Sequence, residues 1–123
     1  MDTARRHLTS AERCADDDPE GALVLAYDAA RKAAGALLAH QGLRSTTRGG
    51  HLAVADVVTA QFPNVAGLRS LDRLRRRRNE AEYPDPAEYA RVTADEAKEA
   101  VETARQTIAS AERLLAVPQL GVF

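Results

Sequence analysis

The segment PEGALVLAYDAARKAAGALLAH, residues 19–40, carries its apolar residues at helical spacing. Positions three or four apart lie on one face of a helix, and here that face is mostly alanine. Because small side chains let a neighbouring backbone approach closely, we expect 19–40 to be the central helix of the fold. The face consists of Leu23, Ala26, Ala30, Ala33 and Leu37.

Local signals mark both ends of this helix. We expect Asp18 to be its N-cap, with Pro19 at the first helical position, where proline is preferred. Gly42 follows the last residue, about His40, as glycine commonly does at helix C-termini. The polar segment 45–50 then predicts a flexible connection.

Four further helices are expected on either side of the central one. No stretch alternates with period two, and short connections between long amphipathic helices favour an antiparallel bundle. The sequence therefore predicts an all-α, antiparallel bundle of four to five helices. The last helix should begin at Thr93-Ala94-Asp95-Glu96, which has the capping-box pattern. The other four expected helices cover about 3–15, 51–62, 65–82 and 94–116.

Length and composition indicate one domain without disulfides or metal. A chain of 123 residues can bury about two thirds of its unfolded surface in one core, which we place at about 3–116, with 117–123 as a tail. The single cysteine, Cys14, excludes a disulfide within the chain, and no Cys/His spacing suits zinc. We expect no cofactor. Because no apolar run nears the roughly twenty residues of a membrane span and no signal-peptide core is present, a cytoplasmic protein is expected.

Charge is balanced overall but uneven along the chain. The formal net charge of −1 argues against a surface coated with nucleic acid. Residues 69–78, however, hold six Arg and one Asp, whereas 16–20 and 80–102 are acidic. This basic run is either a solvated helix face or a surface that draws RNA phosphates. Since no aromatic residues are interleaved with it, sequence-specific RNA recognition is not expected.

One residue of the basic run breaks the helical pattern. Leu71, Leu74, Arg78 and Ala81 fall on one stripe, so Arg78 stands where an apolar residue is expected. Such violations are typical of functional sites. The other arginines of the run, at positions 73, 75, 76 and 77, are expected to point to the flanks or to solvent.

Two polar residues accompany Arg78. Asn79 is its neighbour, and Tyr83 follows Asn79 by four residues, which places both on one helix face. Pro84 disfavours helical geometry at the residue before it, so Tyr83 should lie at the end of the helix or just beyond.

This arrangement resembles the motif of the HEPN domains, in which an Arg, a polar residue that is often Asn and, after four to six residues, a His follow one another. The corresponding residues here are Arg78, Asn79 and Tyr83, with Tyr in the place of His. The segments 26–34, 36–43 and 47–51 look like the HEPN subgroup whose motif ends in Asp-Tyr or Glu-Tyr. The resemblance covers about residues 20–116.

The resemblance implies a homodimer and a phosphate-directed site. In active HEPN ribonucleases two copies of the motif meet across the dimer interface and cleave RNA without metal. By this resemblance Arg78 would stabilise charge on the phosphate, Asn79 would position it, and Tyr83 would replace His in proton transfer. Tyrosine is a weak base at neutral pH, because its ordinary pKa is about 10.

Further phosphate contacts are expected around this motif. His51 begins a predicted helix just after Arg48, so the helix N-terminal amides and these two side chains form a phosphate seat. The alternative for His51 is a surface or hinge-packing histidine. Arg75 and Arg77 are the remaining candidates for RNA binding.

Three functions remain open at this stage. The first is a ribonuclease, constitutive or conditional, in a bacterial toxin-antitoxin, defence or stress system. The second is a non-catalytic module that binds nucleotide or RNA, or an antitoxin or minimal nucleotidyltransferase partner, with Tyr83 as a ligand contact or nucleotidyl acceptor. The third is a structural dimer in which Arg78 forms a buried ion pair with Glu82 or Asp28.

Overall fold

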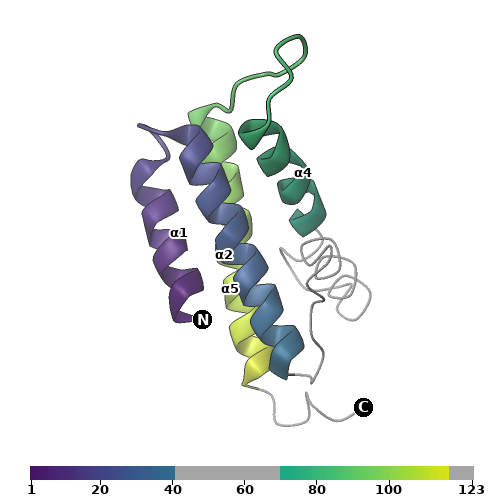
Figure 1. The fold of residues 1–123 in the computed structure, drawn as a ribbon. Helices are drawn as coiled ribbons and strands as arrows, with labels where there is room; N and C mark the ends of the chain where they lie inside the picture. Colours follow the sequence, from purple (N-terminus) through teal and green to yellow (C-terminus); the bar gives the residue numbers. More distant parts are fainter. Residues whose placement is uncertain (41–69, 117–123) are drawn as a thin grey trace.

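The computed structural model describes residues 1–40 and 70–116, which form four packed helices (Figure 1). Within those ranges there is no strand, which confirms the all-α prediction. The predicted helix 51–62, the start of the 65–82 helix and the tail 117–123 lie outside the described residues. The helices are α1 (Asp2–Cys14), α2 (Pro19–His40), α4 (Leu71–Glu82) and α5 (Ala94–Leu115).

Helix α2 is the centre of the fold, as predicted. It packs most extensively against α5 and also contacts α1 and α4. Helices α1 and α4 run opposite to α2, whereas α5 runs beside it in the same direction (Figure 1). All five residues of its predicted apolar face are fully buried, and so is the aromatic side chain of Tyr27. The alanines of this face account for the close packing of α1 and α5 on either side.

Side-chain caps fix the starts of α2 and α5. Asp18 Oδ1 accepts a hydrogen bond from the Gly21 amide at 3.0 Å, which confirms the predicted N-cap. A Cβ at Gly21 would clash with the Asp18 carboxylate in its capping position, so glycine leaves room for the cap. At α5, Thr93 Oγ1 accepts from the Glu96 amide at 3.1 Å.

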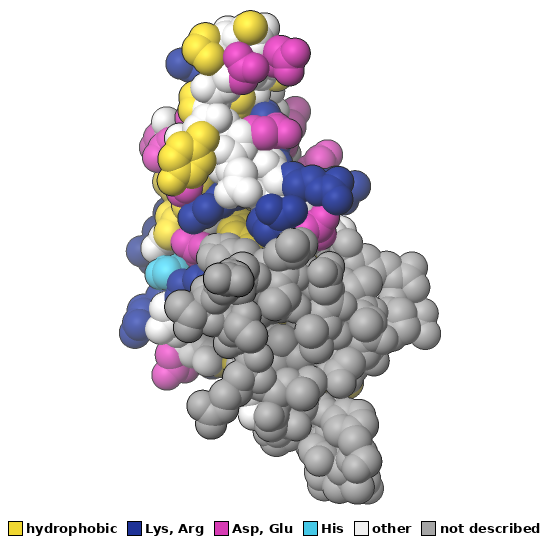
Figure 2. Space-filling view, turned by 45° about the vertical axis from the view of Figure 1, so that its right-hand side comes forward, with side chains coloured by type: hydrophobic (Ala, Val, Ile, Leu, Met, Phe, Trp, Pro, Cys, Tyr) yellow, Lys and Arg dark blue, Asp and Glu magenta, His cyan; other side chains and the backbone are white. Residues whose placement is uncertain are grey.

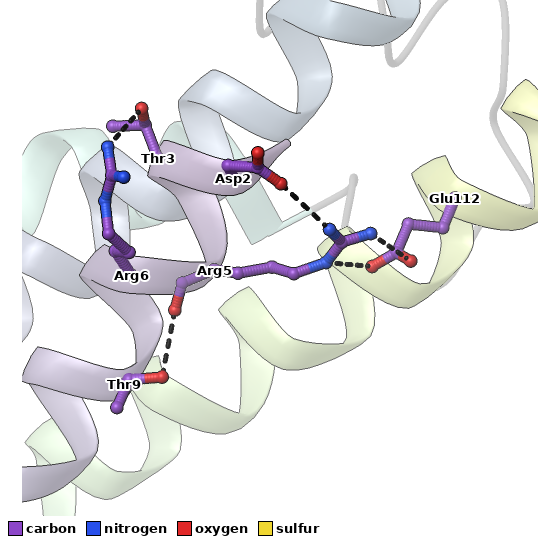
Figure 3. Close-up of polar contacts among 6 residues, drawn as sticks. All are labelled: Asp2, Thr3, Arg5, Arg6, Thr9 and Glu112. Atoms are coloured by element: carbon purple, nitrogen blue, oxygen red, sulfur yellow. Dashed lines mark hydrogen bonds and ion pairs between the residues drawn. The ribbon is translucent and has the colours of Figure 1, made fainter.

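Ion pairs join α1 and the turn that follows it to α5. The Arg5 guanidinium donates two hydrogen bonds to the Glu112 carboxylate, at 2.7 and 3.3 Å (Figure 3). Arg5 thereby lowers the pKa of Glu112 below its usual value. Further along, Arg105 pairs with Glu12 at 3.2 Å and Lys98 with Asp16 at 3.0 Å.

The apolar face of α1 is small. Ala4 and Ala11 are buried, whereas Leu8 is only half-buried and packs at the edge of the core. The ion pairs to α5 therefore add to a modest apolar contact.

Candidate functional site

Arg78 occupies an apolar position of α4, as the sequence predicts. Leu74 and Leu71 are buried one and two turns before it, respectively, and Ala81 packs against the core one turn after it. The Arg78 side chain is 22% exposed, and its guanidinium carbon lies 5.9 Å from the centre of the Tyr27 ring. A half-buried cation resting on an aromatic ring is thus built into the contact between α2 and α4.

The Arg78 guanidinium is oriented by its two neighbours on α4. Its Nη1 donates a hydrogen bond to Asn79 Oδ1 at 3.1 Å and lies 3.3 Å from Glu82 Oε2. From the sequence, Glu82 and Asp28 are possible ion-pair partners of Arg78, and Glu82 is the one in contact. The Asp28 carboxylate lies 3.9 Å from Arg31 instead.

Tyr83 lies at the end of α4, where Pro84 was expected to place it. Its φ and ψ of −130° and 65° are no longer helical, and its amide donates to the Asn79 carbonyl at 2.9 Å. The side chain is 79% exposed. The phenol is therefore open to any molecule that approaches this end of the bundle.

Arg78 and Tyr83 face different surroundings. Among the described residues no contact joins the Tyr83 phenol to the Arg78 guanidinium. Tyr83 instead lines a pocket of about 270 Å³ at the end of the bundle, together with Arg77, Glu80, Asp85, Glu88, Tyr89 and Ala90. The side chains of Arg78 and Asn79 are thus brought together, and that of Tyr83 stands apart from them.

Arg77 differs from the expectation that it would point to a flank or to solvent. Its Nε and Nη2 donate to the Glu96 carboxylate at 2.5 and 3.0 Å, and Nη2 also donates to the Ala90 carbonyl at 2.7 Å. It also pairs with Glu80 at 3.1 Å and lies 5.5 Å from the Tyr89 ring centre. These contacts raise the pKa of Arg77 above its usual value. Arg77 therefore ties α4 to the 83–93 segment and to α5.

The remaining arginines of α4 form a charged face. Arg75 donates to Asp72 at 3.0 Å, Arg76 pairs with the same carboxylate at 2.8 Å, and Arg73 is exposed. Figure 2 shows Lys and Arg side chains gathered across the face on which α4 lies, with acidic and hydrophobic side chains above them. Arg76 is 70% exposed, so this surface is open to an approaching anion.

Two residues of α2 join this site although the sequence did not single them out. Tyr27 supplies the ring under Arg78, and Arg31 follows Tyr27 by one helical turn. The only local signal is an aromatic residue and a cation four positions apart, which is common on helices. Their role follows from the packing of α2 against α4, which the sequence does not state.

The remaining predictions concern two further phosphate-binding residues, metal binding and membrane spans. Arg48 and His51 lie outside the described residues. In the part of the chain that the structure describes, no group of three or more His, Cys, Asp or Glu side chains could hold a metal ion. None of the described helices is both long and apolar enough to cross a membrane.

Comparison with known proteins identifies the family. The family model described as HEPN domain matches residues 1–114, which is nearly the whole chain and includes the Arg78 site. No match was found among curated proteins or among solved structures. The match agrees with the helical architecture. The chain belongs to the HEPN domain family.

Proposed function

We propose that this protein is a metal-independent endoribonuclease of a bacterial toxin-antitoxin, defence or stress system, active as a homodimer. The observation that carries the proposal is the placement of Arg78. A half-buried guanidinium held by Asn79 and Glu82 is pre-oriented, so little of its freedom is lost when it binds a phosphate. Arginine matches phosphate oxygens with two parallel hydrogen bonds.

In the proposed reaction the ribose 2′-oxygen attacks the adjacent phosphorus and the 5′-oxygen leaves. Arg78 stabilises the charge that develops on the non-bridging oxygens, and Asn79 holds Arg78 in place. The Tyr83 phenol protonates the leaving 5′-oxygen, a role that a neutral phenol can fill at pH 7. The proton of the 2′-hydroxyl needs a separate base, for which His51 is the candidate. The products are a 2′,3′-cyclic phosphate and a 5′-hydroxyl end.

The other basic residues have separate roles in this proposal. Arg75 is retained as a phosphate contact beside Arg78, and Arg48 as a phosphate contact near His51. We assign Arg77 to positioning, because its donors are engaged by Glu96, Glu80 and Ala90. It holds the segment that follows Tyr83.

The test is cleavage of total cellular RNA by the purified protein in excess EDTA. We expect cleavage by the wild-type protein and a loss of about 100-fold or more in Arg78→Ala, as for removal of a charge-stabilising group elsewhere. Arg73→Ala is the matched control, since it removes an exposed arginine from the same helix. Circular dichroism must show that all variants are folded. Wild-type protein that cleaves no RNA, or Arg78→Ala that cleaves as fast as Arg73→Ala, would refute the assignment.

A second function is favoured by the exposure of Tyr83. A phenol that is 79% exposed at a helix end is accessible to another enzyme, which suits a partner subunit of a minimal nucleotidyltransferase. In that case Tyr83 accepts a nucleotidyl group or contacts the nucleotide. Mass spectrometry after incubation with ATP and such a partner would show an adenylyl increment that maps to Tyr83 and is absent in Tyr83→Phe.

A further inference from the structure

A second arginine, on the neighbouring helix, lies near the Tyr27 side chain on which Arg78 rests. Arg31 lies one turn after Tyr27 on α2, and residues four apart share a helix face. The Tyr27 ring lies under the Arg78 guanidinium, at 5.9 Å from its centre. Tyr27 is therefore flanked by Arg31 on its own helix and by Arg78 on α4.

Each of these two arginines has a buried donor without an acceptor. The Arg31 Nε is buried and makes no hydrogen bond to the described residues, and Asp28 Oδ1 is 3.9 Å away. The Arg78 Nε is likewise buried without an acceptor, although Nη1 is engaged. A buried charged donor without an acceptor is destabilising, and few remain in folded proteins, so an anionic ligand is a fitting acceptor for both.

The charges around Tyr27 agree with this arrangement. Burial raises the pKa of Tyr27 to about 12, and the charges of Arg31, Arg78 and Arg75 act against that rise. All three guanidinium groups are thus near enough to the phenol to influence it. Their side chains are 22–28% exposed, partly desolvated yet reachable from solvent.

Charge compensation is incomplete at Arg31. Arg75 has Asp72 at 3.0 Å and Arg78 has Glu82 at 3.3 Å, whereas the Arg31 pair is longer than a hydrogen bond. Among the partners that residues 1–40 and 70–116 supply, Arg31 therefore has the weakest of the three, which makes it the cation best able to accept an anion.

We propose that Arg31 and Arg78 bind one phosphodiester group of single-stranded RNA between α2 and α4. The idea rests on the proposed function, in which Arg78 binds the phosphate, and adds a residue from a second helix. Two guanidinium groups on rigid helices hold the phosphate from two directions, and this fixes its orientation for attack in a way that one arginine cannot.

The test is binding of a fluorescein-labelled single-stranded oligonucleotide with 2′-O-methyl riboses, which bind but cannot be cleaved. Anisotropy titrations at several salt concentrations compare wild-type protein with Arg31→Gln, Arg31→Lys, Arg78→Ala and the exposed control Arg73→Gln. We expect Arg31→Gln to weaken binding about tenfold and to reduce the slope of log K against log salt by about 0.7, the value for one lost phosphate contact on a single strand. Arg31→Lys should keep that slope.

The salt slope separates a phosphate contact from a purely structural role. If circular dichroism shows that Arg31→Gln is partly unfolded, Arg31→Lys takes its place in the test. Lysine keeps the charge but cannot form bidentate hydrogen bonds, so the affinity should fall while the salt slope is kept. Arg31 variants that bind as tightly as Arg73→Gln, and with the same slope as wild type, would overturn the proposal.

The outcomes for Arg31 and for the ribonuclease assignment are distinguishable. If Arg78→Ala weakens binding and Arg31→Gln does not, the Arg31 proposal fails and the proposed function stands. If Arg31→Gln weakens binding but no protein cleaves ordinary RNA in EDTA, the phosphate site is supported and the ribonuclease assignment fails. If the wild-type protein does not bind the oligonucleotide, both fail.

Discussion

Arg77 and Arg78 are adjacent in the sequence, yet their guanidinium groups make contacts with different parts of the fold. Arg78 turns toward α2 and rests on Tyr27, whereas Arg77 turns toward α5 and the 83–93 segment. Neighbouring positions on a helix project about 100° apart, so one arginine can face the site while the next holds the structure. An alanine substitution at each residue should therefore have a different main effect.

We predict that Arg77→Ala lowers the free energy of unfolding by about 2 kcal/mol, because hydrogen bonds between charged groups contribute about 1.5–3 kcal/mol. Arg77 is only 18% exposed, which limits solvent screening of its pair with Glu96. Arg77→Lys should recover part of the loss, since a lysine lacks the fork that binds both carboxylate oxygens. Urea denaturation measures both. Arg76→Ala, at an exposed position of the same helix, is the control and should change stability by less than about 0.5 kcal/mol. An Arg77→Ala protein as stable as that control would contradict the assigned role.

At the scale of the helices, alanine at the centre of α2 sets how closely its neighbours approach. Ala30 is fully buried. We predict that Ala30→Leu destabilises the protein by about 1–3 kcal/mol, because a close-packed core has no room for the added carbons. Ala39→Leu is the control, since Ala39 is exposed on the same helix. Thermal unfolding followed by circular dichroism should show a clear drop in Tm for the first variant alone. Equal Tm values would mean that α2 does not pack as described.

The Arg5–Glu112 pair makes the α1–α5 contact sensitive to acid. The pKa of Glu112 is lowered in the folded protein, so its contribution is present above the unfolded value of about 4.3 and is lost as pH falls through the folded value. Both side chains are well exposed, so solvent and salt screen the pair and its contribution is small. We predict that Glu112→Gln is less stable than wild type at pH 7 and that the difference vanishes once the pH has fallen below the lowered pKa of Glu112. A difference that stays constant with pH would contradict this account.

Much of the fold follows from local sequence signals. The caps Asp18 and Thr93 and the alanine stripe of α2 are read from residues within a few positions of one another, and helix bounds expected on that basis agree within one or two residues for α1, α2 and α5. The role of Arg77 could not be foreseen, because its partners Ala90 and Glu96 come from beyond Pro84. For the same reason Arg31 was missed, since its relation to Arg78 exists only after α2 and α4 pack.

At the scale of the whole molecule, the separation of Arg78 from Tyr83 within one chain is relevant to the proposed homodimer. Within the described residues of one chain no contact joins them, whereas in the proposed homodimer the Tyr83 of one chain would meet the Arg78 of the other. We expect sedimentation equilibrium to give twice the mass of one chain. A monomer at micromolar concentration would contradict the proposed dimer.

Mixing variants tests whether the two residues of one site come from different chains. Suppose that Arg78→Ala and Tyr83→Phe are each inactive. If a site is shared between chains, every mixed dimer then contains one intact site, with Arg78 from one chain and Tyr83 from the other. Statistical exchange of equal amounts then restores about one quarter of wild-type cleavage. No recovery after exchange would place both residues of a site in the same chain.

The central claim is that Arg78 belongs to a site that cleaves RNA through the ribose 2′-hydroxyl. It is tested most directly with an oligoribonucleotide that the wild-type protein cuts in EDTA, compared with the same oligonucleotide carrying one 2′-deoxy residue at the cut position. We predict that wild-type protein cuts the first, leaving a 2′,3′-cyclic phosphate, and does not cut the second, while folded Arg78→Ala cuts neither. Cleavage of the 2′-deoxy strand, or equal cleavage of the first by Arg78→Ala, would contradict the account.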